Sequence, residues 1–197
     1  MSPARFDTIG FAPTFTVVVE PAFPAEGSWD CTSYAWGRNG KLINEFDFES
    51  RWGTPLFLRV WPRGGDPWVG AFAAGGLGVV RNVYATPSPR HVCAVVDGLA
   101  YLVDVEEPAR PATIVATAVV DVRAVPDVPL LLLAGDTDLA GVGAEARVWS
   151  TPRVVVDDLR VLRTSTEAIV CSGDVGGRMA TITVTPATGV VWGGDYR

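Results

Sequence analysis

The stretch Val92-Cys-Ala-Val-Val-Asp97-Gly98-Leu-Ala-Tyr101-Leu-Val-Asp-Val105 decides the fold class of this chain. Two runs rich in Val, Leu and Tyr flank the Asp97-Gly98 pair. β-Branched and aromatic residues favour strands, and an Asp-Gly pair accepts the positive φ angles of a two-residue hairpin turn. The stretch therefore predicts a β-hairpin.

Similar apolar hairpins recur on both sides of this stretch. Their first strands begin near Leu56, Val92, Pro129 and Ala168, at offsets of 36, 37 and 39 residues. Such a period, with several strands in each unit, is typical of repeat architectures. Phe15–Glu20 is a candidate fifth member. The second strands are expected at Trp68–Ala73, Leu99–Val105, Leu139–Val142 and Ala180–Val184.

The segment VVDGLAYLVDVEEP, which ends at Pro108, resembles blade hairpins of bacterial WD40-like and other β-propeller-type repeat proteins. The resemblance implies a propeller-like architecture, while a curled sandwich would give a similar number of strands. Lys41–Phe48 fits either a strand or one helical turn, and its β neighbours favour the strand. We expect a single all-β domain over residues 1–197, with antiparallel sheets from about four or five hairpin repeats of roughly 36–40 residues and little or no helix.

Composition narrows the classes of partner. Hydrophobic residues make up 48% of the chain, charged residues 19%, and the net charge is −6 without any run of Lys or Arg. Nucleic-acid binding and attachment to a membrane surface both rely on basic patches, so neither is expected. The three cysteines are far apart, and no apolar run of membrane-spanning or signal-peptide length occurs. We expect a cytoplasmic protein.

Residues that could carry catalysis are few. His91 is the only histidine. With Cys93 two positions further along a predicted strand, it could form a thiol–imidazole pair, although buried cysteines are usually inert. Asp136 and Asp138 lack the further ligands of a calcium loop, and the glycines at 75–78 lack the Lys and Ser/Thr of a phosphate loop. We therefore expect no catalytic residue, no metal site and no cofactor.

The N-terminal third is rich in aromatic residues. Aromatic rings at this density occur at recognition surfaces, but indoles also fill the cores of small β-folds, and their usual burial favours that second interpretation. The candidate binding residues are Trp29, Tyr34, Trp36, Trp52, Trp61, Arg63 and Trp68.

These observations favour a non-enzymatic protein-interaction module of adaptor or immunity-like type, whose partner is another protein. The alternatives are a β-domain that binds carbohydrate or a small molecule through its tryptophans, and a small hydrolase built on carboxylates or on Cys93. An incomplete ring of sheets would leave strand edges exposed, so a homodimer is also possible.

Overall fold

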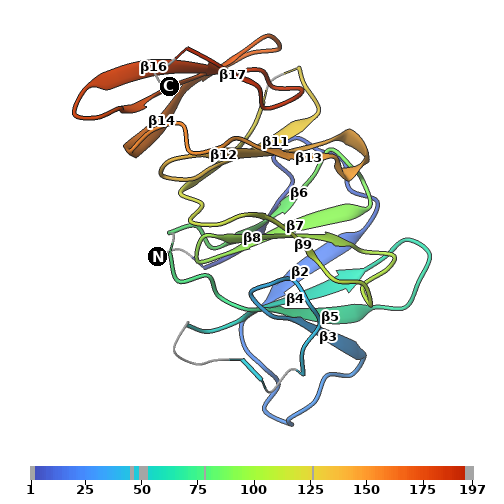
Figure 1. Ribbon diagram of the computed structural model, residues 1–197. Coiled ribbons are helices and arrows are strands. Elements are labelled where there is room, and N and C mark those ends of the chain that lie inside the picture. The colour runs from blue at the N-terminus through green and yellow to red at the C-terminus, as the bar shows by residue number, and fades with distance from the viewer. Residues whose placement is uncertain (1–2, 45–46, 49–52, 78, 126, 194–197) are drawn as a thin grey trace.

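The computed structural model describes residues 3–44, 47–48, 53–77, 79–125 and 127–193. These residues form seventeen β-strands and one short 3₁₀ turn at Ala144–Ala146. The strands make four sheets that lie one on another in a row, with the first and last sheets at opposite ends (Figure 1). The predicted all-β architecture is confirmed. Among the described residues, no helix is long and apolar enough to cross a membrane.

The four predicted hairpins are the central hairpins of the four sheets. Their first strands begin at Leu56, His91, Leu130 and Ile169, each within one residue of the expected position. The turn at Asp97-Gly98 has positive φ at both residues, 49° and 86°, as a two-residue hairpin turn of this kind requires.

Each sheet adds outer strands to its hairpin. The first contains β2 (Thr16–Glu20), β4 (Leu56–Trp61), β5 (Trp68–Phe72) and β3 (Thr32–Trp36). The second contains β1 (Phe6–Asp7), β6 (Asn82–Ala85), β7 (His91–Val96), β8 (Leu99–Asp104) and β9 (Thr113–Ala116). The third contains β10 (Asp121–Ala124), β11 (Leu130–Ala134), β12 (Leu139–Gly143) and β13 (Val148–Ser150). The fourth contains β14 (Asp157–Thr164), β15 (Ile169–Asp174), β16 (Met179–Val184) and β17 (Val191–Trp192).

The N-terminal segments differ from the prediction in two places. The candidate fifth hairpin member lies in the first sheet, where β2 pairs with β4 in the register Thr16↔Trp61. The strand expected at Lys41–Phe48 is wrong for the described part of that segment, which contributes only one isolated bridge, between Leu42 and Trp36. Here the chain turns back through Gly40, whose positive φ of 75° ends β-strand geometry.

The first sheet differs from the third and fourth in its strand directions, and the second sheet also contains one parallel pair, β1 with β6. In the first sheet, β3 lies parallel to β5, whereas β10–β13 and β14–β17 are antiparallel meanders. Trp68, at the start of β5, donates a hydrogen bond to the carbonyl of Val105, just after β8. Gly75, just after β5, donates to Val96, just before the Asp97-Gly98 turn. The turn of the β4–β5 hairpin therefore lies at the opposite end of the strands from the turn of the β7–β8 hairpin.

Alternation of side chains along the central strands builds the core between successive sheets. In β11, Leu131 and Leu133 pack toward the second sheet, while Leu130 and Leu132 pack toward the fourth. This double burial explains why the strand is an unbroken apolar run, because both of its faces are covered. The outer face of the first sheet is covered by Phe23, Trp29, Ile43 and Phe48.

One edge strand of the fourth sheet, β14, is irregular. Strand β14 has register shifts between Asp157 and Arg160 and between Val161 and Arg163. The guanidinium of Arg123 also donates to the carbonyl of Val161 on this edge. Bulges and covered carbonyls hinder the addition of another strand.

Candidate functional site

An open cleft lies on the side of the stack where the β4–β5, β6–β7 and β8–β9 loops meet. It has a volume of about 650 Å³. Side chains from three successive sheets reach it: Arg63 from the first, His91 from the second and Glu145 from the connection after β12 in the third. The full lining is Thr14, Arg63, Ser88, Pro89, Arg90, His91, Asp104, Glu106, Glu107 and Glu145.

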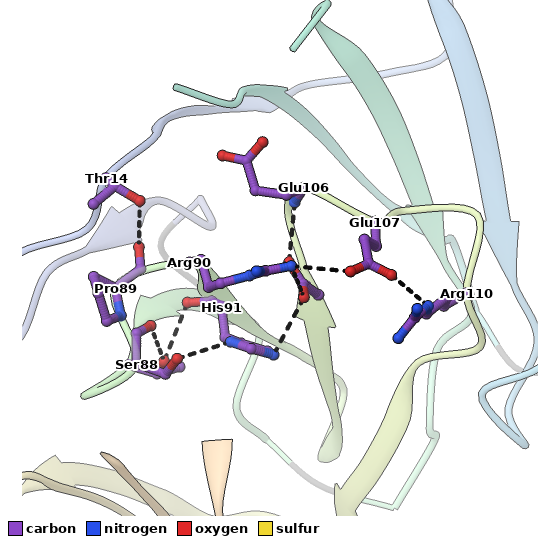
Figure 2. A network of polar contacts seen from close by, with 10 residues as sticks. Thr14, Ser88, Pro89, Arg90, His91, Glu106, Glu107 and Arg110 are labelled. Atoms are coloured by element: carbon purple, nitrogen blue, oxygen red, sulfur yellow. Dashed lines mark hydrogen bonds and ion pairs between the residues drawn. The ribbon is translucent and has the colours of Figure 1, made fainter. Parts of the chain in front are cut away.

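A second shallow cleft, of about 590 Å³, adjoins the first and shares Thr14 and Arg63 with it. It is lined by Pro13, Thr14, Phe15, Thr16, Trp61, Pro62 and Arg63. We call the two clefts together the seam groove, because they follow the seam between the first and second sheets. The backbone N–H and the side-chain hydroxyl of Thr14 donate hydrogen bonds to the carbonyl of Pro89, at 2.8 and 3.0 Å. These bonds join the two walls of the groove (Figure 2).

A polar network anchors the second-sheet wall of the seam groove (Figure 2). The Oγ of Ser88 is hydrogen bonded to Nδ1 of His91 at 2.9 Å, and Nε2 of His91 lies 3.9 Å from Oδ2 of Asp104. Arg90 binds both oxygens of Asp104 and also reaches Glu107 at 3.3 Å. Glu107 in turn pairs with Arg110 at 2.5 Å. Hydrogen bonds and ion pairs therefore connect the polar side chains of this wall.

Ser88, His91 and Asp104 stand in the order of a Ser-His-Asp triad, but their contacts serve the fold. The backbone N–H of His91 donates to the carbonyl of Ser88 at 3.0 Å, so the Ser88–His91 contact closes one tight turn. Asp104 is bound by Arg90 and is too far from His91 to hydrogen bond with its ring. A triad needs that carboxylate to orient the imidazole. The Ser88 side chain is also almost fully buried.

Burial sets the protonation of His91. It lowers the pKa of the imidazole below its ordinary value, while the carboxylate of Asp104 opposes this shift and Arg90 adds to it. The ring is therefore neutral at neutral pH and can hold the Ser88 hydroxyl as a hydrogen-bond partner.

Two charged side chains of the seam groove remain available to a ligand. Within the described residues, neither Arg63 nor Glu106 makes an ion pair, and both are exposed. Trp61 is 39% exposed beside Arg63. The groove thus offers a ligand one exposed indole, three prolines, and one cation and one anion that are not already in ion pairs in the described part of the chain.

The structure places the described binding candidates in different parts of the fold. Trp61 and Arg63 line the seam groove. Trp36 and Trp68 are core residues, 0% and 3% exposed, and their indole nitrogens donate to the carbonyls of Arg110 and Val105. Trp52 lies outside the described residues.

Trp29 and Tyr34, the remaining two, lie elsewhere on the first sheet. Trp29 packs against Phe23 and Phe57 on the covered outer face, with the guanidinium of Arg59 5.6 Å above its ring. Tyr34 packs edge-on against Trp68, on the other side of the β4–β5 loop from the seam groove.

The thiol of Cys93 is unsuited to catalysis. It is fully buried between the second and third sheets, and burial raises its pKa to about 12. A nucleophilic cysteine needs an accessible thiolate. No three His, Cys, Asp or Glu side chains of the described ranges converge as a metal site would need.

The contact between Ser88 and His91 was missed by sequence reasoning. The available signal was a Ser three residues before a His across Pro89, which is typical of a turn closed by a side chain. No protein-family model, curated protein or solved structure matches this chain.

Proposed function

We propose that this protein is a non-enzymatic, cytoplasmic interaction module that receives an extended segment of a partner protein in the seam groove. The exposed ring of Trp61 beside Pro13 and Pro62 carries the proposal. Grooves lined by aromatic and proline side chains bind extended, often proline-containing segments, whose preformed backbone loses little entropy on binding.

The charges beside Trp61 would orient the bound segment. Arg63 and Glu106 lie on the two sides of the groove without ion pairs in the described chain, so each can pair with a partner's side chain. The hydrogen bonds and ion pairs of the second-sheet wall would hold its side chains in place, which lowers the entropic cost of association. The four stacked sheets of four or five strands support a propeller-type repeat scaffold beneath this surface.

The test is capture of a partner by tagged protein from a lysate of the source organism, compared across matched variants. Trp61→Ala and Arg63→Glu should each lose the partner that the native chain retains. Trp192→Ala removes an exposed indole from the fourth sheet, at the far end of the stack, and should retain it. Equal capture by Trp61→Ala and the native chain would contradict the proposal.

A carbohydrate ligand is the second candidate. Trp61 lies beside the hydroxyls of Thr14 and Thr16 in the same cleft, and a sugar ring can stack on an indole while its hydroxyls bond to such groups. Quenching or shift of Trp fluorescence by a glycan, absent in Trp61→Phe, would favour sugar over protein.

A further inference from the structure

Two tryptophans on edge strands contact the sheet that follows their own. Trp36 on β3 and Trp149 on β13 both face the following sheet and donate their indole N–H to a loop of it, at the carbonyls of Arg110 (3.1 Å) and Pro186 (2.9 Å). Both rings lie over a glycine of the neighbouring strand, Gly70 or Gly141, where a Cβ would meet the indole at 2.8 or 2.4 Å.

Trp192 occupies the same kind of position on β17, at the edge of the fourth sheet. Its indole N–H donates to the hydroxyl of Thr185 in its own sheet at 3.0 Å, and the residue is 62% exposed. Within the described residues, no sheet follows the fourth. Trp192 therefore presents on an open face the group that Trp149 buries between the third and fourth sheets.

The open face of the fourth sheet carries a row of four paired residues. Strand pairing aligns Arg163 with Val170, Val170 with Thr183, and Thr183 with Trp192. They share the face opposite to Cys171 and Ile182, which point into the core. Arg163 lies at one edge of the row and Trp192 at the other. Arg163 is exposed and makes no ion pair within the described chain.

This row is complementary to itself. A two-fold axis parallel to the strands, passing between Val170 and Thr183, would lay Arg163 of one copy over Trp192 of the other. It would also place Val170 opposite Thr183. A guanidinium over an indole is a favourable cation–π contact, and the two arginines would lie at opposite edges of the interface, far from each other.

Two other ways of joining copies, head-to-tail stacking and strand addition at β14, are disfavoured. The outer face of the first sheet is already covered by Phe23, Trp29, Ile43 and Phe48, so a head-to-tail stack of copies finds no free face there. Strand addition at the β14 edge is hindered by its two register shifts. Face-to-face contact between two fourth sheets avoids both obstacles.

We propose that the open face of the fourth sheet binds a second copy of this chain about that two-fold axis, with Arg163 and Trp192 as the reciprocal contacts. The proposal is independent of the seam groove, which is lined by residues of the first three sheets. It gives a closed dimer that leaves both grooves free.

Sedimentation across a dilution series tests the dimer on the purified full chain. The native protein should dissociate reversibly from dimer to monomer. Trp192→Ala should raise the dimer dissociation constant at least about tenfold, because large buried rings dominate such interfaces. Arg163→Glu should raise it about fivefold or more, since two Arg–Trp contacts are lost in each dimer.

Two controls fix the interpretation. Arg163→Lys keeps the cation and should weaken the dimer less than Arg163→Glu, and Trp61→Ala, in the seam groove, should leave it unchanged. Trp192 and Arg163 are exposed, so circular dichroism should show that both variants fold. A native chain that stays monomeric throughout the series overturns the proposal. So does a dimer that neither Trp192→Ala nor Arg163→Glu weakens.

Discussion

The indole nitrogen of Trp68 donates a hydrogen bond of 3.0 Å to the carbonyl oxygen of Val105, and this bond joins the first sheet to the second. Trp68→Phe keeps most of the ring but leaves that carbonyl without this donor. We expect the free energy of unfolding to fall by about 1–3 kcal/mol. Urea unfolding measures it, with Trp61→Phe at the surface as the control, expected within about 0.5 kcal/mol of the native chain. Equal stability of the two variants would contradict this role for Trp68.

Gly141 lies beneath the Trp149 ring, and a Cβ there would be 2.4 Å from the indole. Gly141→Ala must therefore displace Trp149 from the junction of the third and fourth sheets, at a cost of about 1–3 kcal/mol. Gly143→Ala, two residues along the same strand, meets its nearest atom at 3.6 Å and is the matched control. Thermal unfolding of the two variants should separate them, and a Gly141→Ala chain as stable as Gly143→Ala would be unexpected.

Thiol reactivity should follow burial. Cys31 is partly exposed, whereas Cys93 and Cys171 are buried in the core, where burial raises their pKa values to about 12 and about 11. In the folded protein a thiol reagent should modify Cys31 alone, and Cys31→Ser should remove the reaction. All three should react in denaturant. Rapid modification of Cys93 in the folded chain would show that the second and third sheets separate.

Stability should depend on pH through His91. Because burial lowers the pKa of its ring in the folded state, the unfolded chain binds the proton more readily as the pH falls below the ordinary histidine pKa of about 6.5. The contribution of neutral His91 to the free energy of unfolding is therefore complete above that pH. It is lost as the pH falls through the lowered pKa of the folded state. Urea unfolding at successive pH values should show a shallower decline in His91→Gln. An unchanged decline would assign the dependence to the carboxylates.

The hairpins were predictable from the sequence because their information is local. Asp97-Gly98 sets its own turn, and apolar runs such as Leu130–Ala134 mark strands that are covered on both faces. The parallel pairing of β3 with β5 was not predictable, because it joins Thr32 to Trp68 across the intervening β4. No local pattern of residues specifies such a partner.

The site was predictable only in part, for a related reason. Trp61 and Arg63 were among the candidates, but nothing in their immediate sequence distinguishes them from Trp36 and Trp68, which are core residues. The difference arises because the β4–β5 loop meets the β6–β7 loop, and Thr14 bonds to Pro89 across that junction. Such contacts depend on how whole sheets are placed.

The opposite turn of the first hairpin bears on the ancestry of the chain. Tandem duplication of a gene segment copies the order and direction of every strand. The runs β6–β9, β10–β13 and β14–β17 meet that condition, and the first strands of their hairpins begin at His91, Leu130 and Ile169, at equal intervals of 39 residues. The first sheet does not, because its hairpin turns at the other end and its β3 edge strand precedes β4 in the chain. A copy that kept strand order would not give the first sheet, so a duplicated unit is to be sought in the runs β6–β9, β10–β13 and β14–β17.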